Sequence, residues 1–193
     1  MKSVGLLGGS FDPPHKGHLY ISLEAKKILK LDKIWWLVTL QNPLKITKPA
    51  SYEERIKNCH SITKKQTIRI TDIENTINSS YSYESIKFII NYYKNIKFFW
   101  LMGADNLINF HHWQKWRSIF NEISIVVFRR HGYNDKALNS VTTKTFSQFQ
   151  VIANPINKSH FKRLPSWTWF NNREIKISST EIRKQREFLR GFY

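Results

Sequence analysis

Residues 4–18 read VGLLGGSFDPPHKGH, and this stretch decides the fold. A short apolar run ends in two glycines, and after two prolines two histidines stand three residues apart. The run fits a buried strand. From His18 onward, Leu19 and Leu23 define an apolar helix face, and lysines define a basic one. We therefore expect a strand, a tight loop and a helix in direct succession.

The loop between this strand and helix has the composition of an anion-binding site. Gly8 and Gly9 let the backbone approach a ligand and leave amides free to point at it. His15 and His18 fall on one side of the first helical turn, where unpaired amides favour anions. Gly17 lies between them and leaves room for a phosphate chain. The alternative interpretation is a capped surface turn with solvated histidines.

Apolar runs alternate with amphipathic stretches along the rest of the chain. Because strand–helix alternation is typical of parallel sheets, we predict an α/β fold: a Rossmann-like, doubly wound parallel sheet with helices on both faces. Ligands would then bind at the carboxyl ends of the strands. We expect strands over 3–8, 33–40, 67–73, 97–102, 123–128 and 167–170, and helices over 18–30, 51–65, 82–94 and 104–120.

The domain organisation expected for residues 1–193 is a single domain. Residues 131–165 have the weakest periodicity and are interpreted as a variable excursion. Residues 178–193 form a short C-terminal helical segment in this interpretation. The one cysteine, Cys59, excludes an intramolecular disulfide framework. With apolar runs too short for a bilayer and no secretory segment, we expect a cytoplasmic protein without a membrane partner.

The formal net charge of +17 is compatible with nucleic acid or with small anionic substrates. The basic residues are scattered and form no long block, which favours small substrates over nucleic acid. A basic RNA-binding module without enzymatic activity remains the alternative from another functional class. It would need a continuous basic face with exposed stacking aromatics. The oligomeric state stays open, a homo-oligomer included.

Two further stretches carry candidate ligand contacts. In ISSTEIRK, residues 177–184, either serine can cap a helix, and Arg183 is placed to clamp phosphate oxygens. In WLMGADN, residues 100–106, Gly103 and Asp105 end a strand and suit a nucleoside contact, although Asp105 could simply cap a helix. The aromatic residues that follow at helical spacing fit a core stripe, which we prefer for Trp116 and Phe120.

GGSFDPPHKGH resembles the signature of the nucleotidyltransferase superfamily, whose HxGH element binds the phosphates of ATP. ISSTEIR resembles the second ATP-binding signature of the same superfamily, ISSTxIR. Together the two signatures imply His15 and His18 as catalytic residues that contact the triphosphate. The ATP-binding residues that this resemblance implies are Gly8, Gly9, Ser10, Phe11, His15, His18, Gly103, Asp105, Ser179, Ile182 and Arg183.

Within the superfamily, four stretches resemble the nicotinate mononucleotide adenylyltransferase family. The segment WLMGADNLINFHHWQKW matches its GxD element and aromatic segment, which implies that Trp113 stacks on the pyridine ring. QNPLK resembles its NPxK element and implies Lys45 as a phosphate ligand. SYS resembles its SYT turn, with Tyr81 and Ser82, whose backbone amides would hold the nicotinate carboxylate. FRRHG resembles its RRPG element and implies that Arg130 reaches the nucleotide.

The resemblance implies transfer of AMP from ATP to nicotinate mononucleotide, which gives the deamido dinucleotide and pyrophosphate in NAD synthesis. Mg²⁺ would be held mainly by phosphates and water, with no metal site built by the protein itself. The family pattern continues past ISSTxIR with a helical tail, whereas this sequence ends ten residues after Arg183. Nicotinamide mononucleotide and phosphopantetheine stay open as alternative acceptors. We do not expect a class I aminoacyl-tRNA synthetase, because 193 residues leave no room for the tRNA-binding domain that such an enzyme needs.

Overall fold

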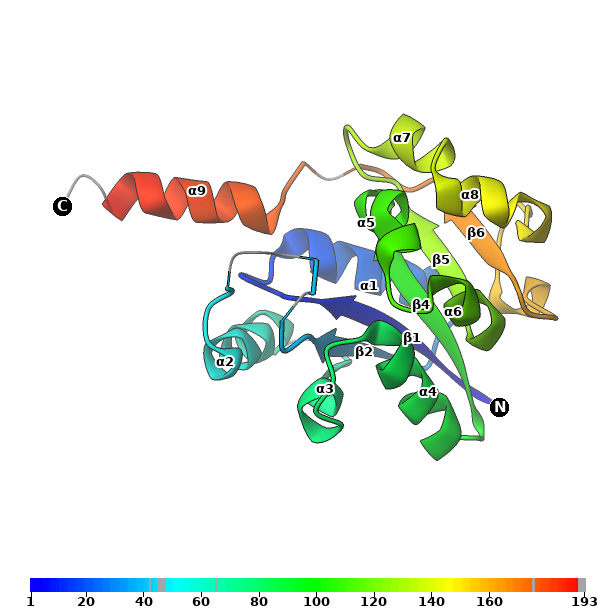
Figure 1. The fold of residues 1–193 in the computed structure, drawn as a ribbon, viewed down its shortest axis with the longest axis horizontal. Coiled ribbons are helices and arrows are strands. Elements are labelled where there is room, and N and C mark those ends of the chain that lie inside the picture. The colour runs from blue at the N-terminus through cyan, green and yellow to red at the C-terminus, as the bar shows by residue number, and fades with distance from the viewer. Residues whose placement is uncertain (42, 45–47, 65, 175, 191–193) are drawn as a thin grey trace.

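The computed structural model describes residues 1–193 except 42, 45–47, 65, 175 and 191–193. It contains a parallel sheet of six strands in the order β3-β2-β1-β4-β5-β6 (Figure 1). The strand order reverses at β1, so the sheet is doubly wound, as the sequence predicts. The strands are β1 (Lys2–Gly9), β2 (Lys33–Val38), β3 (Ile68–Thr71), β4 (Ile96–Gly103), β5 (Ser124–Phe128) and β6 (Trp167–Phe170).

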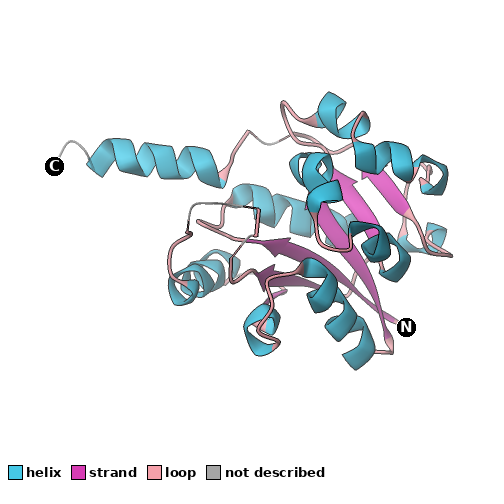
Figure 2. Ribbon diagram, in the orientation of Figure 1, coloured by secondary structure: helices cyan, strands magenta, loops and turns pink. Residues whose placement is uncertain are grey.

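Helices cover both faces of the sheet (Figure 2). One face packs against α1 (Lys16–Ile28) and α2 (Tyr52–Thr63). The other packs against α4 (Ser82–Tyr92), α5 (Ala104–Asn109), α6 (Trp116–Glu122), α7 (Asn134–Leu138) and the segment after α8 (Val141–Thr145). The short α3 (Ile73–Thr76) follows β3, and α9 (Ser179–Arg190) extends away from the sheet (Figure 1). In the described part of the chain, no helix has the length and apolar character to cross a membrane.

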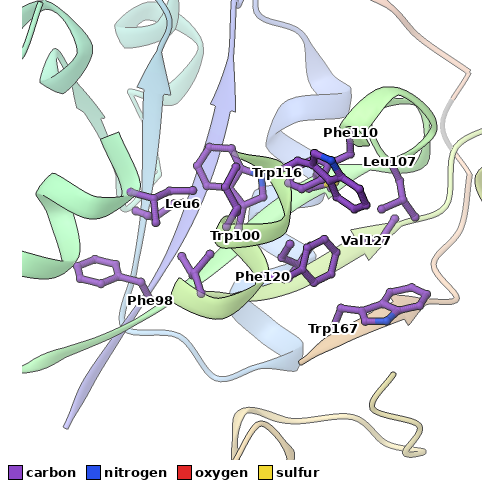
Figure 3. Close-up of a cluster of buried hydrophobic side chains, with 14 of the residues drawn as sticks. Leu6, Phe98, Trp100, Leu107, Phe110, Trp116, Phe120, Val127 and Trp167 are labelled. Carbon is purple, nitrogen blue, oxygen red and sulfur yellow. The ribbon is translucent and has the colours of Figure 1, made fainter. Parts of the chain in front are cut away.

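The strands are apolar throughout because the sheet is buried on both sides. Alternate residues of one strand enter different cores: Trp35 packs on the face of α4–α7, and Trp36 on the face of α1 and α2. Figure 3 shows the first of these cores, where residues of the strands meet aromatic side chains of α6 and β6. Trp116 and Phe120 are buried in it, which confirms the core stripe expected for them.

The predicted helix over 104–120 is wrong in its extent. The chain forms α5, a 3₁₀ turn over Phe110–His112, and then α6. Lys115 has a φ of 51°, in the left-handed region, and Trp113 is extended. These dihedral angles interrupt the helix and turn Trp113 out of the core stripe. The strand expected over 67–73 also ends earlier, at Thr71, because Ile73 begins α3.

The segment 131–165 contains α7, α8 and two 3₁₀ turns, and it contributes to both cores. Phe146 stacks on Phe120 with ring centroids 3.8 Å apart, and its carbonyl accepts a 2.8 Å hydrogen bond from the indole of Trp167. Phe161 packs edge-on against Phe99 on the opposite face. Polar composition therefore conceals a segment whose few aromatic side chains complete the hydrophobic cores.

Gly8 is required by packing beneath the strand end. A Cβ atom at this position would lie 2.6 Å from Cη2 of Trp100 on the neighbouring β4. Neither Gly8 nor Gly9 has a positive φ, so the chain does not turn at these glycines. It turns at Phe11, whose φ is 48°.

We expect Gly8→Ala to lower the free energy of unfolding by about 1–3 kcal/mol, because the new methyl group overpacks a buried indole. Urea unfolding followed by circular dichroism measures this change. Gly9→Ala is the matched control, since its Cβ atom would find its nearest neighbour, Cε2 of Phe11, at 3.4 Å. Equal losses of stability in the two variants would contradict the role given to Trp100.

Candidate active site

The principal cavity lies at the carboxyl ends of the strands, where β1 and β4 diverge. Its volume is about 510 Å³, within the range of ~300–1,000 Å³ common for small-molecule sites. Residues of the β1–α1 loop, the ends of β2, β4 and β5, the start of α4 and the start of α9 line it. Of the predicted residues, those at the cavity are Gly8, Gly9, Ser10, Phe11, His15, His18, Tyr81, Ser82, Gly103, Asp105, Trp113, Arg130, Ser179 and Arg183.

Phe11 turns the β1–α1 loop toward the start of α1. Its left-handed backbone costs free energy for a residue with a bulky side chain. Burial offsets that cost, since the ring is 1 % exposed and stacks on Trp36 with centroids 4.6 Å apart. The same ring lies 4.8 Å from the imidazole of His18. The buried ring of Phe11 therefore packs against His18 and Trp36.

His15 and His18 form the N-terminal cap of α1. Nδ1 of His15 accepts a 3.1 Å hydrogen bond from the amide of Gly17, and Nδ1 of His18 accepts one of 3.2 Å from the amide of His15. Since each Nδ1 acts as an acceptor, each neutral ring carries its proton on Nε2. Both rings are thereby fixed as Nε2–H donors, with centroids 3.8 Å apart.

Burial keeps both imidazoles neutral. Desolvation, with the nearby Arg130 as a lesser cause, lowers the pKa of His15 to about 4. Desolvation followed by the charges of His15 and Arg130 lowers the pKa of His18 well below its usual value. Solvated histidines, the alternative considered above, do not describe this loop. Gly17 also differs from expectation: a Cβ there would meet the His15 ring at 2.9 Å and Cγ2 of Ile177 at 3.1 Å, so packing fills this space.

The ISSTEIR segment joins the β1–α1 loop from the far end of the chain. Ser178 caps α9 by accepting a 3.1 Å hydrogen bond from the amide of Glu181. Ser179 Oγ donates to the carbonyl of Pro13 at 2.9 Å, and the Arg183 guanidinium donates to the carbonyl of Asp12. The two predicted ATP signatures therefore meet at one wall of the cavity. Ile182 lies in the first turn of α9, and the cavity lining does not include it.

Asp105 and Arg130 form an ion pair across the cavity. Asp105 belongs to the first turn of α5, and Arg130 lies in the chain just after β5. The guanidinium of Arg130 also donates to the carbonyl of Ile177 at 3.5 Å. Asp105 makes no side-chain cap bond; the cap residue is Gly103, where a Cβ would lie 2.5 Å from Oδ1 of Asp105. Gly103 is thus the residue that lets this carboxylate fold back over the strand end.

A different part of the wall combines an aromatic ring with a helix start. Trp113 packs edge-on against Trp100, with centroids 6.3 Å apart, and beside Phe110 at 4.7 Å. Tyr81 is the N-cap of α4 and is 41 % exposed, and Ser82 is the first residue of that helix. Helix geometry leaves the amide of Ser82 without an intrahelical acceptor. Lys45, the expected phosphate ligand, lies outside the described residues.

Sequence reasoning missed both Arg55 and Glu74. Arg55 is 1 % exposed and donates to four backbone carbonyls. Glu74 accepts hydrogen bonds from Thr39 Oγ1 at 2.5 Å and from the amide of Leu40 at 3.1 Å, and burial raises its pKa to about 7. Arg55 shares a helix face with the buried Cys59, and an arginine on an apolar face is the signal that could have revealed it.

Three helices of more than eight residues, α1, α4 and α9, begin at this cavity. Helix starts favour anions, and the neutral Nε2–H groups and the arginines Arg129, Arg130 and Arg183 add donors. The doubly wound sheet and this wall define a nucleotide-binding α/β protein. The comparisons with known proteins narrow the class further.

Residues 6–185 match the model of the cytidylyltransferase-like family. A protein of Ruegeria sp. (strain TM1040), named "Probable nicotinate-nucleotide adenylyltransferase", is 43 % identical over 186 residues, covering 95 % of this chain and 97 % of the relative. A protein of the same name from Agrobacterium fabrum is 37 % identical over 181 residues, covering 93 % and 97 %. The chain therefore belongs to the nicotinate-nucleotide adenylyltransferases of the cytidylyltransferase-like family.

A solved structure has the same fold. Nicotinic acid mononucleotide adenylyltransferase of Plasmodium falciparum, in complex with NaAD, aligns with a TM-score of 0.72, covering 95 % of this chain and 83 % of that one. The sequence identity is 18 %, so this likeness concerns the arrangement of the sheet and helices.

The buried His15 predicts that stability depends on pH. Because its pKa is about 4 in the folded chain against 6.5 for an unperturbed histidine, acid protonates the unfolded chain first. The free energy of unfolding is then unaffected by His15 above pH 6.5 and falls by on the order of 3 kcal/mol as the pH drops to 4. Urea unfolding at several pH values measures it.

His15→Asn is the matched variant, since the amide oxygen can still cap α1 but does not titrate. We expect the stability advantage of the native chain over this variant to shrink between pH 6.5 and 4. An advantage that stays constant over this interval contradicts the neutral, buried imidazole.

Proposed function

We propose that this chain transfers the AMP group of ATP to nicotinate mononucleotide, which gives nicotinate adenine dinucleotide and pyrophosphate in NAD biosynthesis. The observation that carries the proposal is the meeting of both ATP signatures at one wall, through Ser179 and Arg183, with Trp113 and the start of α4 at another part of the same cavity. The two anionic substrates would therefore bind at separate helix starts within one site, ATP at α1 and α9 and the mononucleotide at α4.

The reaction needs no protein nucleophile. A phosphate oxygen of the mononucleotide attacks the α-phosphorus of ATP, the bond from this phosphorus to the bridging oxygen breaks, and pyrophosphate leaves with the electron pair. The protein contributes alignment and charge stabilisation. The capped rings of His15 and His18 suit this role because their Nε2–H donors are already oriented.

The triphosphate would lie along α1 and α9, in this proposal. Ser179 and Arg183 already contact the β1–α1 loop and would hold the β- and γ-phosphates of the departing pyrophosphate. Gly103 and Asp105 would contact the nucleoside at the end of β4. Ser10, Phe11 and the backbone at Gly8 and Gly9 would form the floor beneath it.

Mg²⁺ fits this cavity as a partner of the substrate. Two carboxylates, Asp12 and Asp105, belong to the cavity wall. Arg183 lies against Asp12, and Arg130 lies against Asp105. A hard cation that keeps phosphate and water ligands suits such a wall. When bound, the ion would neutralise charge on the phosphates, and the protein residues would align them.

The acceptor would bind with its pyridine ring against Trp113 and its carboxylate at the start of α4. The amide of Tyr81 already bonds to Ser79 Oγ at 3.2 Å, so the amides of Ser82 and Tyr83 are the available donors. Two N–H donors at a positive helix end suit a carboxylate better than an amide, which presents an NH₂ group. This geometry supports the acid over nicotinamide mononucleotide as the substrate. Arg130 would reach the mononucleotide by leaving Asp105.

Pyrophosphate release from ATP and Mg²⁺ tests the proposed function directly. Nicotinate mononucleotide, nicotinamide mononucleotide and phosphopantetheine are supplied in separate reactions, with a fourth reaction lacking an acceptor. We expect the fastest release with nicotinate mononucleotide, because its carboxylate matches the start of α4. Release with phosphopantetheine alone, or with none of the three, would overturn the proposal.

The role of His18 can be separated from its role as a cap. His18→Asn keeps an acceptor for the amide of His15 and loses the Nε2–H donor. We expect kcat to fall by about 10²–10³, as for the loss of one transition-state donor. The circular dichroism spectrum should stay unchanged. His60→Asn, at an exposed position of α2, is the control and should keep the native kcat. Native turnover in His18→Asn would remove this histidine from the catalytic residues.

A further inference from the structure

Arg55 is a buried cation that makes its bonds to backbone carbonyls. Its Nε donates to Ala50 at 3.0 Å, Nη1 donates to Ser10 at 2.8 Å and to Thr39 at 2.7 Å, and Nη2 donates to Leu40 at 3.0 Å. The ring of Tyr52 lies 5.4 Å from the guanidinium carbon. Desolvation lowers the pKa of Arg55, with Asp12 and Tyr52 acting in the opposite direction.

The four carbonyls belong to three separate parts of the chain. Ser10 lies in the loop after β1, and Thr39 and Leu40 follow β2. Ala50 immediately precedes the N-cap of α2. The carbonyls of Leu40 and Ala50 therefore bond to the same guanidinium. Between these two ends, Pro43 and Leu44 line the cavity.

Glu74 also binds the Thr39–Leu40 pair. It accepts the hydroxyl of Thr39 and the amide of Leu40, while the amide of Thr39 donates to the carbonyl of Gly9 at 3.0 Å. With the two carbonyls bound to Arg55, every backbone polar group of this pair has a partner. The end of β2 is thus fixed by one buried cation and one buried carboxyl group.

Burying a guanidinium is expensive, and a well-packed apolar residue often stabilises a protein as well or better. The planar fork offers something that an apolar residue or a lysine lacks, namely several donors in a fixed geometry. Here those donors connect the loop after β1, at Ser10, to the carbonyls of Leu40 and Ala50. This arrangement indicates that Arg55 positions the backbone segments that it contacts more than it stabilises the fold.

We propose that Arg55 is a positioning residue that holds the acceptor wall of the cavity, at Pro43 and Leu44, in register with the ATP-binding loop. The inference rests on the proposed function, and it adds the wall at Pro43 and Leu44 to the mononucleotide side of the cavity. Arg55 acts through backbone carbonyls and does not contact the reacting groups.

The two substrates should depend on Arg55 unequally. The loop after β1 has other attachments: Ser179 bonds to Pro13, Arg183 bonds to Asp12, and the histidine cap holds its end. The carbonyls of Leu40 and Ala50 have Arg55 as their side-chain partner, while Glu74 adds bonds at the Thr39–Leu40 end. Loss of the fork should therefore displace the acceptor wall more than the ATP wall.

The test uses Arg55→Lys and Arg55→Gln in the full chain. Lysine keeps the charge without the fork, and glutamine keeps two N–H donors without leaving a buried charge. Lys57→Gln removes a charge from an exposed position of the same helix and is the control. Steady-state kcat and KM are measured for ATP and for nicotinate mononucleotide, at temperatures where circular dichroism shows each variant to be folded.

We expect at least one folded Arg55 variant in which kcat/KM for the mononucleotide falls about tenfold or more, as for a misplaced substrate. KM for the mononucleotide should rise while KM for ATP and all constants of Lys57→Gln stay near native values. Equal changes in both KM values, native kinetics, or a failure of both variants to fold would overturn the positioning role. The native chain reports separately on the proposed function, since its turnover of nicotinate mononucleotide does not depend on any variant.

Discussion

The chain reverses its direction across the sheet between β1 and β4, and right-handed crossovers then send the next helices to opposite faces. The segment after β1 leads to α1 on one face, and the segment after β4 leads to α5 on the other. A gap must open between two loops that separate in this way. The histidine cap, Gly103 and Asp105 reach the cavity because of this gap, and the same geometry brings Trp100 beneath Gly8.

Closing the gap from outside requires a segment far away in sequence. The start of α9 performs this task. Ser179 donates to the carbonyl of Pro13 and Arg183 donates to the carbonyl of Asp12, across sequence separations of 166 and 171 residues. The carbonyls of Asp12 and Pro13 in the loop are thus occupied, while its imidazoles stay neutral through burial and capping. Neutral donors suit a site where the substrate brings the negative charge, because they present N–H groups without an ion that must first be paired.

The sequence predicted the sheet because strands buried on both faces are continuously apolar. Residue types typical of phosphate binding also predicted residues that lie at the cavity, such as His15 and Arg183. The sequence did not predict features that depend on tertiary packing. Nothing local indicates that Phe11 has a left-handed backbone, since the stacked ring of Trp36 provides the compensation. The helical periodicity around Trp113 also concealed a break, because a core stripe and a cavity-lining ring share the same spacing. Arg55 escaped notice because its partners are carbonyls, which have no sequence signature.

The two walls of the cavity differ in how they are held. The wall at the HxGH loop is attached by a helix cap and by α9, elements that carry the shared signatures of the superfamily. The wall at Pro43 and Leu44 is attached at both ends through the guanidinium of Arg55, and Glu74 adds a bond at Leu40. At Leu40 and Ala50 the guanidinium bonds to backbone carbonyls, so this attachment does not depend on the side chains at these two positions. Such a division is what a fold needs if one nucleotide-binding half is to serve different acceptors, since function changes in sites and loops while the scaffold stays.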